Sequence, residues 1–153
     1  MKNKFIKYYM DVAQLTSTLS YATRLQVGAV IVKGHKLLAT GYNGMPSGWD
    51  NNCEDEIGHV LDDANNIVET RLKTKQEVLH AEMNCLMKVA GSTESSTGTI
   101  MFCTHAPCID CAKAMYQAGI IEVVYKNTYR TEEGLYFLEK CGVKLTKFVE
   151  NDK

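Results

Sequence analysis

The chain has 153 residues, of which 45% are hydrophobic and 23% charged, and its formal net charge is −1. These values are typical of one globular domain and exclude a disordered or collagen-like chain. The near-neutral charge argues against a protein that coats DNA or RNA, but it is compatible with a small anionic ligand held by a few polar groups. No apolar run approaches the roughly 20 residues of a membrane span, and the N-terminus has no signal-peptide pattern. We therefore expect no membrane and no nucleic-acid partner.

The first half of the chain predicts one helix, two strands and a long loop. Apolar residues at three- and four-residue spacing predict an amphipathic helix over residues 3–19. Residues 27–32 and 37–42 predict two strands of a hairpin. Residues 43–76 are polar and rich in turn formers, which is typical of a long functional loop inserted in a single domain of residues 1–153. Within this loop we expect residues 57–72 to be helical.

From residue 78 onward, helices and strands alternate in the pattern. This alternation implies an α/β fold, with parallel crossovers in a sheet and helices on its faces. The expected helices are 80–89, 107–118 and 132–140, and the expected strands are 99–104, 121–126 and 143–148.

Cysteine is the one unusual residue type in the composition. The six cysteines are Cys53, Cys85, Cys103, Cys108, Cys111 and Cys141. Three disulfides would need an oxidising compartment, and nothing in the sequence directs export. In a reducing cytoplasm, the same residues are buried apolar side chains or metal ligands.

A metal site is indicated by two helix starts. Cys108 and Cys111 are spaced i, i+3, so they share a face of the first helical turn, where the helix dipole favours the thiolates that a metal needs. A lone pair of this kind can also be a redox pair or a chance pair of core cysteines. His80 begins another helix and would supply a third ligand. Three protein ligands are typical of a catalytic zinc ion, whereas a structural zinc ion normally has four.

Three residues are candidates for a fourth ligand that would close such a site. Cys103 lies in an apolar strand and is more typical of core packing. Cys85 lies five residues after His80, about 140° around the helix, and cannot easily share the ion. His105 stays a candidate.

Glu82 favours catalysis over a structural role. Positions i and i+2 of a regular helix differ by about 200°, so His80 and Glu82 converge only if His80 precedes the helical backbone. Glu82 would then lie beside the open zinc position, where a carboxylate carries protons. The alternative is a first-turn glutamate that complements the helix dipole. Together with the three candidate ligands, we favour the proton carrier.

His80-Ala81-Glu82 followed by Pro107-Cys108-x-x-Cys111 resembles the zinc-dependent nucleoside and nucleotide deaminases, whose pattern is H-x-E and P-C-x-x-C. Within that superfamily the chain is most similar to the deoxycytidylate (dCMP) deaminase family. The NGMP element separates this family from tRNA adenosine and free-base deaminases. The matching blocks, in order, are QVGAVIV, TGYNGMPSG, HAEMN, THAPCIDCAKAMYQAGI and VVYKNTY.

The resemblance implies a cytidine deaminase-like three-layer α/β/α sandwich with a central five-stranded mixed sheet. It implies zinc-dependent hydrolysis of dCMP to dUMP and ammonia, feeding dTMP synthesis. The alternatives are another cytidine or deoxycytidine nucleotide deaminase, a tRNA deaminase, or a non-catalytic zinc-binding interaction module. The implied zinc ligands are His80, Cys108 and Cys111, with Glu82 catalytic.

The resemblance also implies where ligands bind. Asn43 would bind the sugar 3′-OH and Ala81 would line the substrate site, while the 5′-phosphate candidates are Ser20, Arg24, Tyr129 and Arg130. Family members are commonly hexamers that dCTP with Mg²⁺ activates and dTTP inhibits, in the cytoplasm of a cell or of a virus's host. The effector candidates here are Gly44, Met45 and Gly48. Some viral members carry a second, structural zinc, but Cys53 and His59 alone do not make a closed site.

Overall fold

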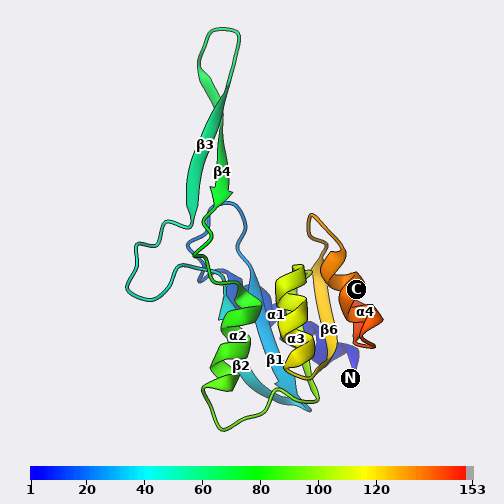
Figure 1. Ribbon diagram of the computed structural model, residues 1–153. Coiled ribbons are helices and arrows are strands. Elements are labelled where there is room, and N and C mark those ends of the chain that lie inside the picture. The colour runs from blue at the N-terminus through cyan, green and yellow to red at the C-terminus, as the bar shows by residue number, and fades with distance from the viewer. Residues whose placement is uncertain (151–153) are drawn as a thin grey trace.

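The centre of the molecule is a mixed five-stranded sheet with the strand order β2-β1-β5-β6-β7, seen in a computed structural model that describes residues 1–150 (Figure 1). Strand β1 runs antiparallel to β2 and β5, whereas β5, β6 and β7 run parallel. The strands are β1 Gly28–Lys33, β2 Lys36–Tyr42, β5 Thr99–His105, β6 Ile120–Asn127 and β7 Lys144–Lys147. The expected five-stranded mixed sheet is confirmed.

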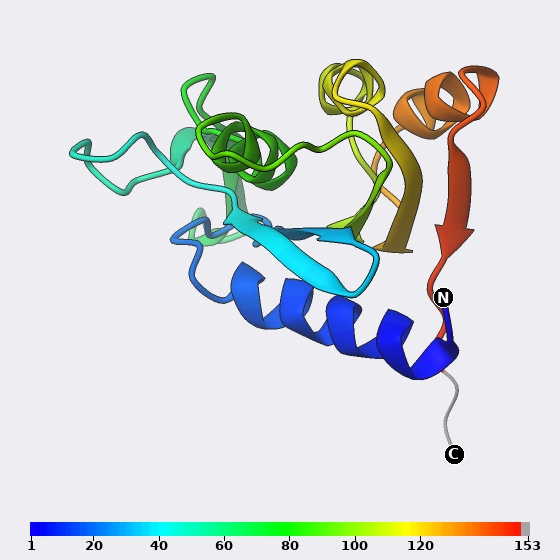
Figure 2. The same cartoon turned by 90° about the horizontal axis from the view of Figure 1, so that it is seen from below.

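Helices cover both faces of this sheet. Figure 2 shows α1 (Asn3–Ser17) on one side and the three other helices on the opposite side. Those helices are α2 Ala81–Ala90, α3 Ile109–Gln117 and α4 Glu133–Lys140. Helix α1 packs on β1, β2 and β5, while α2 packs on β2 and β1. The arrangement is the expected three-layer α/β/α sandwich.

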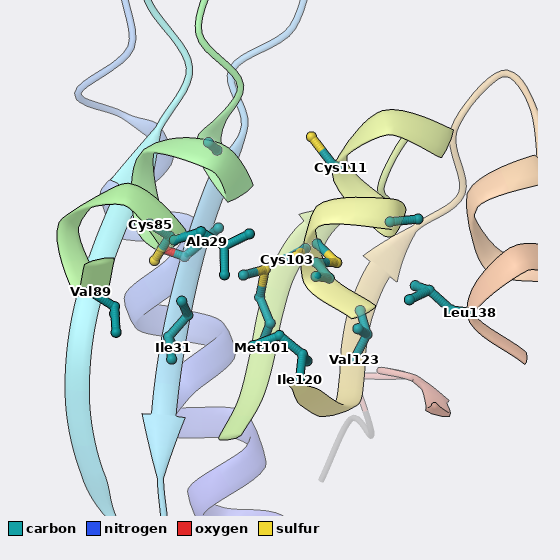
Figure 3. Close-up of a cluster of buried hydrophobic side chains, with 14 of the residues drawn as sticks. Ala29, Ile31, Cys85, Val89, Met101, Cys103, Cys111, Ile120, Val123 and Leu138 are labelled. Atoms are coloured by element: carbon teal, nitrogen blue, oxygen red, sulfur yellow. The ribbon is translucent and has the colours of Figure 1, made fainter. Parts of the chain in front are cut away.

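The two faces of the sheet bury separate apolar cores. Along β1, Ala29 and Ile31 contribute to the core beneath α2, α3 and α4 (Figure 3), whereas Val30 belongs to the core beneath α1. Neighbouring residues of a strand point to opposite faces, so a strand covered on both sides is apolar throughout. Fully burying a side chain such as Phe102 stabilises the fold by about 1.5–3 kcal/mol.

Near the end of helix α1, three consecutive hydroxyl side chains donate hydrogen bonds to backbone carbonyl groups of the helix. The hydroxyls of Thr16, Ser17 and Thr18 donate to the backbone oxygens of residues 12, 14 and 15, each at 2.7 Å. The bonds from Ser17 and Thr18 reach carbonyls of the last turn, which a helix end leaves without partners, whereas the bond from Thr16 reaches a carbonyl inside the helix. The chain therefore leaves the helix at Ser17 rather than at the predicted residue 19, and turns toward the segment that leads into β1.

The predicted helix over residues 57–72 is wrong, because this segment is a β-hairpin. Strands β3 (Glu54–Leu61) and β4 (Ile67–Thr74) pair with each other in a separate two-stranded sheet that projects from the body (Figure 1). At its tip, Asp62 Oδ1 accepts the backbone N–H groups of Ala64 and Asn66 at 2.9 and 2.8 Å, and Asn65 is left-handed with φ 62°. These are turn residues rather than helix residues.

Candidate metal centre and active site

The starts of α2 and α3 bring one histidine and two cysteines together. His80 and Cys108 are the residues that precede the two helices, both with extended backbone, and Cys111 lies in the first turn of α3. His80 Nδ1 lies 3.5 Å from Cys108 Sγ and 3.4 Å from Cys111 Sγ. These three form the only group of three or more His, Cys, Asp or Glu side chains within residues 1–150 whose ligand atoms could share an ion.

The spacing of these atoms suits zinc. With Zn–S near 2.3 Å and Zn–N near 2.0–2.1 Å, a tetrahedral ion separates a sulfur from a nitrogen ligand by about 3.6 Å. The observed nitrogen–sulfur distances of 3.5 and 3.4 Å are close to this value. The donor set, one imidazole nitrogen and two sulfurs, is also one that zinc prefers.

The electrostatics of the two sulfurs also favour a cation. Hydrogen bonds from Cys111 and His80 lower the pKa of Cys108 to about 3, although its burial opposes this. The shared hydrogen bond with Cys108, together with burial, raises the pKa of Cys111. The shared hydrogen bond therefore shifts the two thiols in opposite directions, Cys108 toward the thiolate and Cys111 toward the thiol. A divalent ion in the same place would compensate the charge of two thiolates.

The remaining candidate ligands do not join this group. Cys85 Sγ donates to the carbonyl oxygen of Ala39 at 3.3 Å, and burial raises its pKa to about 12. Cys103 is fully buried in the core, and burial raises its pKa. His105 Nδ1 lies 3.1 Å from Thr104 Oγ1 instead. Three ligands leave a coordination position open, as in catalytic zinc sites.

Glu82 converges on the three ligands. The backbone of His80 has φ −73° and ψ 149°, so His80 precedes the helix as the convergence requires. Glu82 is 4% exposed, and its Oε2 lies 3.8 Å from Cys111 Sγ. Burial raises the pKa of Glu82. A carboxyl group whose pKa is raised holds a proton more readily than an exposed one, which suits a group that takes up and releases protons.

A cavity that opens to solvent lies beside Glu82. The cavity is lined by Leu25, Val27, Asn43, Thr74, Val78, His80, Ala81, Glu82, His105, Ala106, Cys108 and Tyr129. It therefore brings together Glu82, two of the three candidate metal ligands and, of the expected substrate residues, Asn43, Ala81 and Tyr129.

Asn43 is fixed in one orientation at the cavity wall. Its Oδ1 accepts the N–H of Val27 at 2.8 Å, and its Nδ2 donates to the carbonyl oxygen of Leu25 at 2.9 Å. Exchanging the amide oxygen and nitrogen would lose both bonds, so the orientation is unambiguous. One N–H and one lone pair of this amide stay free for a ligand hydroxyl. Ala81 is fully buried at the N-terminus of α2.

The other expected phosphate residues lie around the cavity rather than in its lining. Ser20 is buried, and its hydroxyl donates to the backbone oxygen of Asn43 at 2.7 Å, which supports the Asn43 segment. The guanidinium of Arg24 donates to the hydroxyl of Thr74 at 3.0 Å. Arg130 is exposed and follows Tyr129 directly in the chain.

The base of the hairpin forms part of the cavity wall. Glu54, at the start of β3, is buried, and its Oε1 accepts the backbone N–H groups of Thr23 and Arg24 at 3.0 and 3.1 Å. Thr74, at the end of β4, lines the cavity. The long segment expected to be a loop therefore contributes to the site through its two ends. Leu25, Val27, Thr74 and Val78 also line the cavity, and no local pattern in the sequence marks them as site residues.

The three expected effector residues lie outside the cavity lining. Gly44 forms an isolated bridge with Leu79, through N–H to oxygen distances of 3.1 and 2.8 Å. Met45 packs against the small cluster of Ala22, Cys53 and Val78. Gly48 is exposed, with φ 85°. The bridge ties this loop to the residue that precedes His80.

Comparison with known proteins identifies relatives along almost the whole chain. A family model described as the cytidine and deoxycytidylate deaminase zinc-binding region matches residues 3–127. The deoxycytidylate deaminases of Schizosaccharomyces pombe and Homo sapiens are each 34% identical to this chain, covering 93% and 94% of it. The chain spans only 43% of the length of the S. pombe protein, and 79% of the human one.

A solved structure shares the fold of this chain. The crystal structure of dCMP deaminase from the cyanophage S-TIM5, in complex with dCMP and dUMP, is 41% identical in sequence and superimposes with a TM-score of 0.83. The match covers 97% of this chain and 99% of the cyanophage chain. The α/β/α arrangement described above is therefore also found in this relative.

Proposed function

Because the chain belongs to the cytidine and deoxycytidylate deaminase family, we propose that it hydrolyses dCMP to dUMP and ammonia, and so feeds dTMP synthesis. One observation supports this function above the others. The buried carboxyl group of Glu82 lies against a His80, Cys108 and Cys111 group that has zinc spacing, beside a cavity that opens to solvent.

In this proposal, His80 Nδ1 and the sulfurs of Cys108 and Cys111 hold the zinc ion. When bound, zinc supplies a Lewis acid that makes water a stronger acid and nucleophile near neutral pH. The starts of α2 and α3 position the three ligands, so the site does not depend on a flexible loop. The helix N-termini also favour the negative charge of the two thiolates.

Glu82 moves the protons of the reaction. Its carboxylate takes one proton from the attacking water and gives it to ring N3, which makes C4 more electrophilic as the water oxygen bonds to C4. It then transfers the second proton of that oxygen to the amine. The C4–N bond breaks, C4 becomes a carbonyl carbon and ammonia leaves. A positioned acid–base group typically contributes about 10²–10⁴ in rate.

The substrate residues take their proposed roles from their places around the cavity. Asn43 offers a free N–H and a lone pair to the sugar 3′-OH, and Ala81 lies where the cavity meets α2. Tyr129 lines the cavity at its β6 side, and Arg130 follows it. The positive charge of Arg24 lies next to the wall residue Thr74. We propose that Tyr129, Arg130, Arg24 and Ser20 receive the 5′-phosphate, and Ser20 also supports Asn43 through its hydrogen bond.

A substrate panel tests the proposed reaction. Ammonia release is measured with dCMP, dCTP, deoxycytidine and a tRNA anticodon arm, on protein of known zinc content. We expect dCMP to react fastest. Faster reaction of another substrate would mean that the protein is a different deaminase of the same superfamily. Full zinc content with no deamination of any substrate would identify a non-catalytic zinc-binding module.

We also propose that the chain forms a homo-oligomer, as a hexamer, that dCTP with Mg²⁺ activates and dTTP inhibits. The large apolar side chains of Leu15, Leu19 and Tyr21 are 72%, 59% and 69% exposed near the end of α1, which supports burial between subunits. The Gly44–Leu79 bridge links the proposed effector loop to His80. Light scattering gives the subunit number. The deamination rate at subsaturating dCMP is then measured with dCTP or dTTP added. A rate that changes with neither nucleotide would contradict the proposed regulation.

We place this activity in the cytoplasm. All six cysteines are free thiols. Free buried thiols are typical of a reducing compartment. Among the helices of residues 1–150, none has the length and apolar character that crossing a membrane requires.

A further inference from the structure

Thr104 and His105, at the end of β5, form a hydrogen-bonded pair beside the cavity. The backbone N–H of Gly28, on the neighbouring strand β1, donates to Thr104 Oγ1 at 3.1 Å. The same oxygen lies 3.1 Å from His105 Nδ1. Thr104 is 4% exposed, so these contacts account for the hydrogen bonding of its hydroxyl.

These contacts determine which ring nitrogen of His105 carries the proton. Because the Gly28 N–H can only donate, Thr104 Oγ1 accepts there. Within residues 1–150, the sole acceptor that the Thr104 O–H reaches is His105 Nδ1. A proton on Nδ1 would leave the buried O–H without an acceptor, which costs about 1–3 kcal/mol. Nδ1 is therefore the acceptor, and the proton lies on Nε2.

The Nε2–H group is the open donor of a residue that lines the cavity. His105 lines the cavity, and none of the protein hydrogen bonds found for residues 1–150 involves its Nε2. No buried side-chain nitrogen or oxygen in this described part of the chain lacks a partner, so Nε2 is open to solvent. Burial also lowers the pKa of His105, which favours the neutral ring. A neutral imidazole thus presents a single donor in a fixed direction.

We propose that His105 is a specificity-determining residue that donates a hydrogen bond from Nε2 to an acceptor oxygen of the bound nucleotide, and that Thr104 is the positioning residue that fixes this donor. The proposal rests on the proposed function, in that it assigns a contact to the nucleotide of the same cavity. A fixed donor favours nucleotides with an oxygen acceptor at this place, and disfavours those that present a donor there.

Kinetics of four variants test the two roles. We expect His105→Leu to raise the KM for dCMP about tenfold, the effect of one lost hydrogen bond, with kcat within about twofold. Thr104→Val should raise the KM for dCMP in the same way. Thr104→Ser keeps the hydroxyl, so its KM should equal that of the wild-type protein. The double variant Thr104→Val/His105→Leu should be no worse than His105→Leu, because the two residues act through one contact. Zinc content must stay unchanged in each.

A matched control lies on the hairpin. His59 Nδ1 lies 3.3 Å from Thr70 Oγ1, a similar pair that is exposed and outside the cavity. His59→Leu should leave KM unchanged. A His105→Leu variant with wild-type KM would overturn the proposal. So would nitrogen chemical shifts that place the His105 proton on Nδ1 in the wild-type protein, a measurement that does not depend on whether Thr104→Val folds.

Comparing two substrates, dCMP and deoxycytidine, shows which part of the nucleotide His105 contacts. A binding measurement distinguishes failure of this proposal from failure of the proposed reaction. A loss with dCMP but not with deoxycytidine places the donor at the phosphate, whereas an equal loss with both places it at the base or sugar. If the wild-type protein does not deaminate dCMP, the proposed function fails. Calorimetric binding of dCMP then decides the contact: binding about tenfold weaker in His105→Leu supports it, and unchanged or absent binding overturns it.

Discussion

Glu82 and His80 lie two residues apart, yet both face the same site because the helix begins between them. His80 is extended and Ala81 is the first helical residue. A helix starting one turn earlier would turn the two side chains about 200° apart. The convergence could be anticipated from the residue spacing, since only a helix start at this position brings both groups to one ion. The proton-carrying role of Glu82 stays a prediction.

Replacing the Glu82 carboxyl group by an amide tests that role. Glu82→Gln keeps the shape of the side chain but cannot carry protons between water, N3 and the amine. We expect kcat to fall by about 10²–10⁴ with zinc content unchanged. Glu77→Gln, at an exposed position before the helix, is the control and should keep the wild-type rate. More than about a tenth of the wild-type kcat in Glu82→Gln would contradict the role.

Other residues of the cavity could not be predicted individually. Thr74 reaches the wall only because Glu54 anchors the hairpin base to the backbone of Thr23 and Arg24. Asn43 is oriented by backbone groups of Leu25 and Val27, which lie far from it in the sequence. These contacts depend on how distant segments pack, and no local spacing encodes them.

At the scale of elements, the β3–β4 hairpin is the one whose type the local sequence pattern did not predict. Strands β3 and β4 are exposed along most of their length, so apolar and polar residues do not alternate as they do in a strand with one buried face. The pairing also shifts between Glu56 and Gly58, and again between Val60 and Leu61, which disturbs the two-residue period further. Elements with a buried face, such as β1, were predicted closely.

The same exposure predicts a difference in local stability. A two-stranded sheet with no covering layer is marginally stable alone. We expect amides in the outer part of the β3–β4 hairpin to exchange hydrogen at low opening free energy, while those of β1 and β5 approach the global value of about 5–15 kcal/mol. Mass-spectrometric hydrogen exchange measures both. Equal protection would mean that another surface covers the hairpin in solution.

Helix α4 closely approaches the turn that carries Cys108, a proposed zinc ligand. A Cβ at Gly134 would lie 2.2 Å from the backbone oxygen of Pro107 and 3.0 Å from the backbone of Cys108. We therefore expect Gly134→Ala to displace the Cys108 turn, lowering zinc affinity and costing about 1–3 kcal/mol of unfolding free energy. Thermal unfolding and zinc titration measure the two effects.

Gly91→Ala is the control for this close approach. Its new Cβ would meet only the oxygens of Met87 and Lys88, at 3.4 and 3.9 Å, which are ordinary contact distances. Both zinc affinity and thermal stability should stay at wild-type values. Wild-type zinc affinity in Gly134→Ala would show that α4 does not hold the Cys108 turn in place.

At the scale of the whole molecule, the layers explain why the site is rigid. The sheet anchors α2 and α3 side by side, and their starts meet at His80, Cys108 and Cys111, the proposed zinc ligands. The alternation of strands and helices was sufficient to predict this architecture, because covered parallel strands need helices on both faces. The packing of subunits depends on exposed surfaces such as Leu15 and Tyr21, on which sequence period gives no information.

Zinc titration into metal-free protein, with dCMP conversion followed at each step, tests the central claim most directly. We expect dUMP and ammonia to appear in equal amounts, at a rate that rises in proportion to bound zinc and levels off at one ion per chain, held by His80, Cys108 and Cys111. Conversion in the metal-free protein, or no conversion once one zinc ion is bound, would contradict it.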